Sequence, residues 1–282
     1  MRRLQRHRRL SREHRALSER RTFALPRTLD TTGPLARTVA DSIAFDSAVR
    51  GITSPAPIMP ASLKGQRFVI DPTFSERHAV SPSVLGQLHA VVERLRDAVV
   101  ERLRDAGAQV DARRLATLDQ LHELIRMYGW LGGLEAFNVH RALLDWPDAE
   151  CIDQRVRTRL EASRVVPAER RAFLREQRLA MIASFRDELA DITLIAPTVP
   201  HVAPLRAPLE ADPELFARVN LQTLSMTMPG SFLDTPTVAL PSGTDADGLP
   251  TSVQLMRAQN DDDALLRIAL SVQHHANCSS EI

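Results

Sequence analysis

Two β-rich runs near the C-terminus constrain the fold of this chain most. PTVALPSG (236–243) and PTSVQLMRA (250–258) are separated by TDADGL, whose Asp247-Gly248 pair is typical of a tight turn. We expect these runs to form adjacent strands. A helix over 264–275 follows, with acidic residues 261–263 placed to cap its positive end. Strands that alternate with helices predict an α/β fold.

The rest of the chain repeats this alternation. Apolar spacing predicts a helix over 39–49, with Thr38 as its cap and Gly51 as its stop. We expect a strand over 67–71 after the Lys64-Gly65 turn, then a helix from about Ser83 to Gly107, and a buried strand within 191–204. The chain between them, over 115–190, is expected to be mostly helical. Its helices should break near Gly129, at Gly132-Gly133, at Trp146-Pro147 and at Pro167.

An exact repeat lies inside the expected helix that ends at Gly107. Residues 91–98 and 99–106 both read VVERLRDA. Eight residues advance a helix by about 800°, so the two copies face directions about 80° apart. We therefore expect one copy to protrude, bulge or repack. Eight identities in a row favour a recent in-frame duplication over a tolerated helix extension.

The N-terminal 21 residues differ from the remainder. They hold nine arginines and two glutamates, whereas the whole chain has 36 basic and 35 acidic residues. Few apolar residues are present to anchor this head, so we expect a frayed helix or a disordered arm. An arginine-rich arm can also attract nucleic acid or a membrane surface, but the absence of aromatic residues and the glutamates disfavour that alternative. We divide the chain into 1–21 (head), 22–275 (main domain) and 276–282 (polar tail).

Composition excludes several classes of protein. The chain is 44% hydrophobic, and no run approaches the ~18 apolar residues of a membrane span, so we expect a soluble, cytoplasmic protein. Cys151 and Cys278 lack metal-ligand spacing, and neither HExxH nor GxSxG occurs. No metal or cofactor is implied. The nine histidines are interpreted as surface or core residues.

Several blocks, taken in order, resemble the amidase signature family of Ser-cisSer-Lys amide hydrolases. The similar blocks are LPRTLDTTGPLARTVADS (25–42), LKGQRFVID (63–71), GGLEAFNVHRALL (132–144), IDQRVRTRL (152–160), DITLIAPTVPHVAP (191–204) and MPGSFLDTPTVALPSGTDADGLPTSVQLM (228–256). The resemblance implies a mixed β-sheet layered between α-helices, and hydrolysis of carboxylic amide C–N bonds in small molecules. It covers residues 22–275 and corresponds to the C-terminal portion of the family, with the N-terminal half missing.

The family's catalytic residues lie upstream of the LDTxGP block, and no equivalent of that segment is found here. Lys64 is the chain's one lysine, and it lies downstream, in the LKG turn. Ser11, Ser18 and Ser242 lack the glycine-rich context of the family's nucleophile. A serine hydroxyl needs an adjacent base to become a nucleophile. No catalytic residue is therefore assigned, and we expect a truncated chain, a pseudoenzyme that is inactive alone.

The resemblance still implies part of a substrate pocket. Its walls would come from the helical mid-section near Phe137 and from the loop that holds Phe232, Leu233 and Asp234. A structural role is an equal alternative, with Phe137 in the core and Asp234 as a loop cap. Two further functions stay open: a non-catalytic fragment that binds a partner, and a subunit that needs a separate N-terminal half. We also expect low solubility or a molten state, because a missing half exposes strand edges and apolar helix faces.

Overall fold

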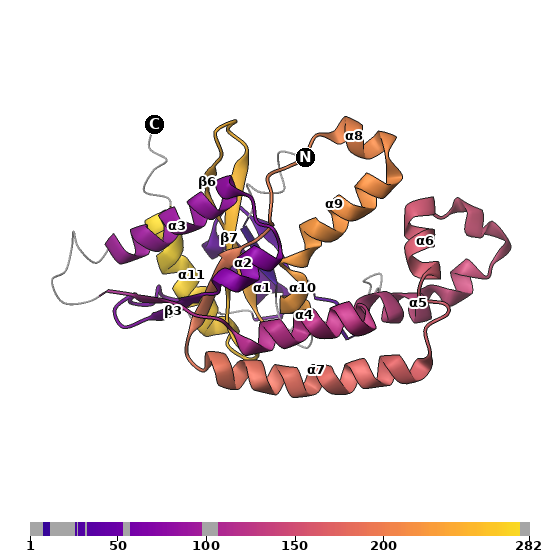
Figure 1. Ribbon diagram of the computed structural model, residues 1–282. Coiled ribbons are helices and arrows are strands. Elements are labelled where there is room, and N and C mark those ends of the chain that lie inside the picture. Colours follow the sequence, from indigo (N-terminus) through magenta and orange to yellow (C-terminus); the bar gives the residue numbers. More distant parts are fainter. Residues whose placement is uncertain are drawn as a thin grey trace.

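The computed structural model describes residues 8–11, 26, 28–31, 33–52, 57–97 and 107–276 (Figure 1). Within these residues the strands form one mixed sheet in the order β2-β1-β6-β7-β5-β3-β4. The strands are β1 (Arg8–Ser11), β2 (Leu35–Ala36), β3 (Arg67–Ile70), β4 (Gln109–Ala112), β5 (Thr193–Pro197), β6 (Thr237–Thr244) and β7 (Pro250–Met256). β3 pairs in parallel with β4 and β5, and the other pairs are antiparallel. The predicted α/β fold with a mixed sheet is confirmed.

Helices cover both faces of this sheet (Figure 1). They are α1 (Val39–Val49), α2 (Pro72–Arg77), α3 (Pro82–Asp97), α4 (Ala116–Tyr128), α5 (Leu131–Leu144), the 3-10 helix η1 (Pro147–Cys151), α6 (Gln154–Glu161), α7 (Ala168–Leu189), α8 (Arg206–Ala211), α9 (Pro213–Ser225), α10 (Met228–Phe232) and α11 (Asp262–Ala276). Within the described residues, none of these helices is long and apolar enough to cross a bilayer.

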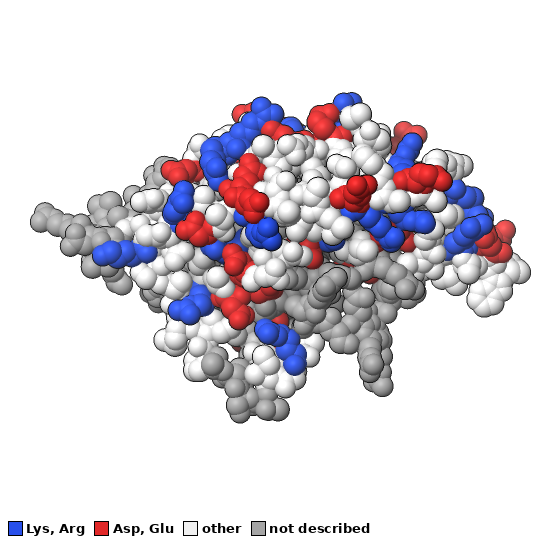
Figure 2. All heavy atoms as spheres, turned by 90° about the horizontal axis from the view of Figure 1, so that it is seen from below, with Lys and Arg blue, Asp and Glu red and all other residues white. Residues whose placement is uncertain are grey.

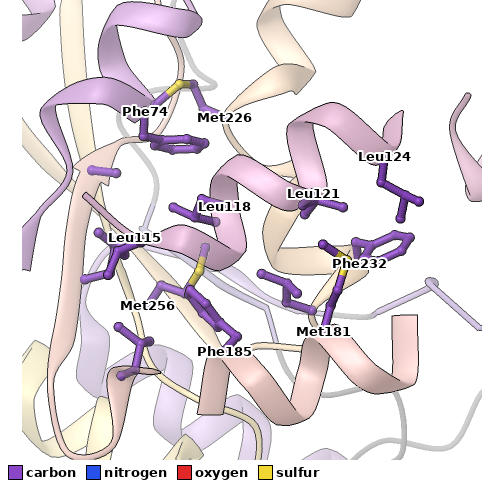
Figure 3. Packing of buried hydrophobic residues seen from close by; sticks show 14 of the residues in the cluster. Phe74, Leu115, Leu118, Leu121, Leu124, Met181, Phe185, Met226, Phe232 and Met256 are labelled. Carbon is purple, nitrogen blue, oxygen red and sulfur yellow. The ribbon is translucent and has the colours of Figure 1, made fainter. Parts of the chain in front are cut away.

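The core consists of two layers separated by the sheet. One layer packs α2, α4, α5, α7 and α10 against the sheet and includes Leu194 and Met256 (Figure 3). The other packs α1, α3 and α11 against the opposite face and includes Ile195 and Leu255. Successive strand residues point to opposite faces, so neighbours in β5 and β7 enter different layers. This double burial explains why Leu194–Pro197 of β5 are all apolar.

Local sequence signals account for several elements. Thr38 caps α1 through a capping box with Asp41, in which each side chain accepts a hydrogen bond from the other residue's backbone N–H. The predicted hairpin is confirmed by β6 and β7, and Gly248 takes a positive φ of 73° in their turn. Such a φ carries little cost for glycine, which has no Cβ.

The predicted helix break at Gly132-Gly133 is wrong. Both glycines lie in the first turn of α5, which begins at Leu131. The first N–H groups of a helix have no partner within the helix, so weak helix formers are tolerated there. The indole of Trp130 covers Gly132 so closely that a Cβ would collide with it.

Part of the arginine-rich head is a strand. Arg8–Ser11 form β1, which pairs with β6 on one side and β2 on the other. The expectation of a frayed helix or a disordered arm is therefore wrong for these four residues. The physical reason is that backbone groups on the open side of β6 accept a partner whatever its side-chain charge. The other residues of 1–21 lie outside the described residues.

The internal repeat is described only in part. Its first copy enters α3, which ends at Asp97, and the second copy over 99–106 lies outside the described residues. How the two copies are accommodated therefore stays a prediction.

Candidate functional site

Three of the four predicted pocket residues occupy one buried turn. Phe232 ends α10 and Leu233 follows it, and each side chain is 1% exposed. Both belong to the core layer that α4 and α7 enclose, where Figure 3 places Phe232 near Met181. The Phe232 ring lies 6.0 Å from that of Trp130, at the start of α5. This packing fixes the turn in position.

Asp234 completes the turn in a strained backbone conformation. Its φ is 53°, in the left-handed region that aspartate tolerates better than most residues. Gln259 Nε2 donates a 2.7 Å hydrogen bond to Asp234 Oδ2. Arg178 Nη2, from α7, lies 3.7 Å from Asp234 Oδ1. The carboxylate therefore joins the turn to both α7 and the segment after β7.

Arg178 is an unusual core residue. Its side chain is 11% exposed, and its Nε and Nη2 atoms have no hydrogen-bond partner. Burial lowers the pKa of this guanidinium, while the charges of Asp234 and Glu135 act in the opposite direction. Arginine nevertheless stays protonated in proteins. A fixed positive charge is thus held beside the predicted pocket turn.

Glu135 forms a second buried ionic contact near Arg178. Its side chain is 1% exposed on α5, and Oε1 accepts from Arg175 Nε at 2.8 Å and Nη2 at 2.7 Å. Oε2 accepts from the Thr28 backbone N–H and hydroxyl, both at 2.9 Å. A carboxylate with this many donors is well compensated for burial. Glu135 therefore ties the loop at Thr28 to α5 and α7.

Sequence reasoning missed this cluster. Thr28 lies in the LPRTLDTTGP block and Glu135 lies 107 residues later in the GGLEAFN block. No local spacing connects the two. An acidic residue inside the apolar stretch LGGLEAF is the one signal present, because a buried charge needs a partner.

Phe137, the fourth predicted pocket residue, lies apart from the two core layers. It is 7% exposed on α5, and the Arg164 guanidinium lies 5.3 Å from its ring centroid. Arg164 in turn pairs with Glu161 and Asp145. Phe137 thus has a cation–π partner, Arg164, in the segment that follows α6.

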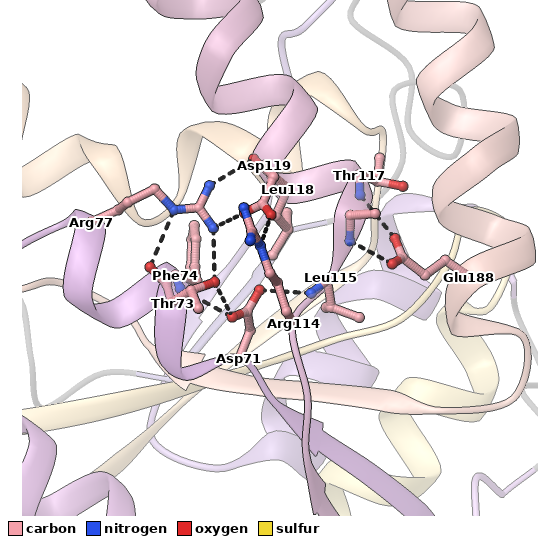
Figure 4. A network of polar contacts seen from close by, with 11 residues as sticks. Asp71, Thr73, Phe74, Arg77, Arg114, Leu115, Thr117, Leu118, Asp119 and Glu188 are labelled. Carbon is pink, nitrogen blue, oxygen red and sulfur yellow. Dashed lines mark hydrogen bonds and ion pairs between the residues drawn. The ribbon is translucent and has the colours of Figure 1, made fainter.

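The carboxyl end of β3 carries a polar network (Figure 4). Ligands of open α/β sheets often bind at such ends, so this network is a candidate site. Asp71 caps α2: its Oδ1 accepts from the Thr73 hydroxyl at 2.7 Å and the Phe74 N–H at 3.1 Å. Its Oδ2 accepts from the Leu115 N–H at 3.0 Å. Asp71 therefore joins the loop before α2 to the loop before α4.

Neighbouring groups complete this network. Arg77 and Arg114 both pair with Asp119 on α4. Glu188 of α7 accepts hydrogen bonds from the Ala116 and Thr117 N–H groups at the start of α4 (Figure 4). These contacts satisfy N–H groups that an isolated helix leaves unpaired. The network therefore stabilises the β3–α2 and β4–α4 connections.

His78 lies beside the same network and is neutral near pH 7. Burial, then the His122 imidazole and Arg77, lower its pKa to about 4. Its ring packs edge-on against Phe74, with 4.7 Å between centroids. Among the described residues, no group of three or more His, Cys, Asp or Glu is arranged to hold a metal ion.

Lys64 lies in the exposed turn before β3. Its backbone N–H donates to Ser62 Oγ at 3.2 Å. Among the described residues, no serine hydroxyl lies within hydrogen-bond distance of its ammonium group. The surrounding hollow is lined by Arg67, Arg257 and Arg267 together with Asp191 and Asp263. This mixture of charges is typical of a solvated surface.

Charges are also interspersed on the face that includes α7. Figure 2 shows arginines next to acidic residues on this face, without one continuous basic patch. Exposed ion pairs such as Arg186–Asp187 and Arg126–Glu123 also place opposite charges side by side. This face lacks the uniform positive surface that nucleic acids prefer.

Comparisons with known proteins agree on one family. The model of the family described as Amidase matches residues 10–266. The 2-amino-5-chloromuconic acid deaminase of Comamonas testosteroni is 31% identical over 260 residues, which are 88% of this chain and 52% of the deaminase. A glutamyl-tRNA(Gln) amidotransferase subunit of Chlamydia pneumoniae is 24% identical over 288 residues, covering 93% of this chain and 56% of that protein.

The fold comparison leads to the same group of proteins. A crystal structure of an amidase superposes with a TM-score of 0.75 at 21% identity, covering 95% of this chain and 58% of that one. This chain thus spans about half the length of the curated relatives that it matches over most of its own length.

Proposed function

Because this chain belongs to the amidase family, we propose that it acts in the hydrolysis of carboxylic amide or related C–N bonds of small molecules. In this proposal residues 22–275 correspond to the C-terminal portion of an amidase. They contribute one wall of the substrate site, backed by the buried turn Phe232–Asp234, while Phe137 lies apart from that turn on α5. The buried Glu135 and Arg178 hold this wall in place through the contacts described above.

We propose further that the chain alone does not turn over amides. The observation that carries this proposal is the environment of Lys64, the one lysine, which is exposed and has no serine hydroxyl as a neighbour among the described residues. A serine nucleophile needs a base within hydrogen-bond reach, and the oxyanion needs preorganised donors. In this proposal, polypeptide outside residues 1–282 supplies both groups. A relative that is named as a subunit contains such further chain, since this chain covers 56% of it.

The test is amide turnover by the purified chain. Ammonia release from benzamide and 4-nitroaniline release from 4-nitroacetanilide are measured for the natural chain and for Lys64→Met. We expect both proteins to match a mock preparation, and a fluorophosphonate probe to label no serine. Turnover that Lys64→Met abolishes would show that this chain carries its own Lys-dependent site and would overturn the proposal.

A further inference from the structure

The helix α9 has an apolar side that no described residue covers. Its sequence, PELFARVNLQTLS, includes six apolar side chains besides the proline, yet none of its residues is buried. Leu221 is 60% exposed and Leu224 is 43% exposed. Surface helices of soluble proteins place polar residues on such a side. A helix with many apolar residues and none of them buried is instead typical of a segment that packs against another polypeptide.

Two apolar sides can be distinguished on α9. Leu215, Phe216 and Val219 are half-buried and face the molecule, where the Arg155 guanidinium of α6 lies 4.7 Å from the Phe216 ring. Ala217, Leu221 and Leu224 are exposed and recur at spacings of four and three residues, so they share another side. We call these three residues the outer stripe.

The position of α9 connects the outer stripe to the proposed substrate wall. Thr223 Oγ1, on α9, lies 3.0 Å from His201 Nε2 in the loop after β5. After Ser225 the chain enters α10, which ends at Phe232 in the pocket turn. In Figure 1, α9 extends away from the sheet between α10 and α8. A polypeptide that covers the outer stripe would therefore lie next to this wall.

We propose that the outer stripe is the docking surface for a polypeptide segment that completes the amidase fold. This proposal rests on the proposed function. The solved amidase superposes on 95% of this chain, while this chain covers 58% of the amidase. The amidase thus contains substantial chain outside the part that it shares with this protein, and in our proposal that chain covers the outer stripe, which no described residue covers. The match to the Comamonas deaminase likewise covers 88% of this chain but 52% of the deaminase.

The test uses a defined partner. The part of the Comamonas deaminase that its match to this chain does not cover is fused to maltose-binding protein and co-expressed with the full chain. Co-purification is measured first, and the dissociation constant is then measured by biolayer interferometry. The variant is Leu221→Gln/Leu224→Gln. The matched control is Val165→Gln/Leu179→Gln, which replaces two exposed aliphatic residues outside α9, 85% and 69% exposed.

We expect the natural chain to bind the fusion and the outer-stripe variant to bind about tenfold or more weakly, as for the central apolar residues of an interface. The control should change binding by less than about twofold. Circular dichroism must show that all three chains are folded. Binding is measured independently of amide turnover. Turnover by the chain alone would therefore overturn the proposed function, but it would not decide the docking proposal.

Three results would overturn the docking proposal. The first is a soluble, folded fusion that does not bind the folded natural chain. The second is an outer-stripe variant that binds as tightly as the control. The third is a natural chain that dimerises in sedimentation and loses the dimer in Leu221→Gln/Leu224→Gln, because a second copy would then occupy the stripe.

Discussion

At the residue scale, buried charges distinguish this chain from an ordinary α/β core. Glu135 and Arg178 lie among apolar side chains, and each depends on partners from distant segments. Removing one member of a buried pair leaves the other charge uncompensated, which costs more than the pair gains. The cluster should therefore be sensitive to substitutions that conserve size and remove charge.

Glu135→Gln tests that sensitivity. We expect a loss of about 2 kcal/mol in the free energy of unfolding, below the usual cost for a fully buried pair because Arg175 is half exposed. Urea unfolding followed by circular dichroism measures the change. Glu176→Gln, at an exposed position on α7, is the control and should change stability by less than about 0.5 kcal/mol. Equal effects of the two substitutions would contradict a structural role for the Glu135 contacts.

The lowered pKa of His78 predicts that the stability of the fold decreases in acid. Its pKa in the folded protein is about 4, below the ordinary value of 6.5, so the unfolded chain binds the proton more readily. Stability from this group is present above about pH 6.5 and is lost as the pH falls toward 4. His78→Gln should flatten the pH dependence of unfolding in that window. The exposed His89→Gln should leave it unchanged, and an NMR titration midpoint of His78 near 6.5 would refute the prediction.

At the element scale, one helix end stores backbone strain. Ala190 follows α7 with a φ of 48° and a ψ of −111°. A Cβ is disfavoured at positive φ, whereas glycine accepts such values and is common just after a helix. The chain therefore maintains this turn at some cost in stability.

Ala190→Gly should stabilise the protein by about 0.5–1 kcal/mol, since relief of strain exceeds the extra entropy of the unfolded chain. Ala180→Gly, at an exposed position inside α7, is the matched control and should destabilise by about 1 kcal/mol. Thermal and urea unfolding compare the two. Destabilisation by both substitutions would mean that the positive φ at Ala190 carries no strain.

At the scale of the whole molecule, the N-terminal head takes part in the sheet. β1 covers the edge of β6, and an uncovered strand edge is a site for pairing with other molecules. The head is therefore a structural element in addition to a source of positive charge.

Deletion of residues 1–21 should raise self-association and lower the midpoint of urea unfolding. Sedimentation velocity and 1-anilinonaphthalene-8-sulfonate fluorescence are the measurements, and deletion of residues 279–282 is the control. A shortened chain that stays as monomeric as the control would argue against the pairing of β1 with β6. Salt-sensitive DNA binding that disappears with residues 1–21 would instead support the nucleic-acid alternative for the head.

Local elements were the part of the fold that could be predicted from the sequence. The Thr38 capping box, the turn at Gly248 and the apolar run of β5 each depend on residues close together in the chain, where neighbouring side chains and backbone dihedrals act directly. The mixed α/β sheet followed from the order of these elements and from the family resemblance. The predicted break at Gly132-Gly133 was wrong because both glycines lie in the first turn of α5, where weak helix formers are tolerated.

Tertiary structure alone decided the contacts between distant segments. Glu135 meets Thr28 across 107 residues, and Asp71 meets Leu115 across 44. β1 joins a sheet despite its arginines. Such contacts depend on how whole layers pack, because a buried charge or an open strand edge takes the partner that the fold brings near. No spacing within one segment encodes that partner, so the family resemblance pointed to Asp234 but only the folded chain showed its pairing with Arg178.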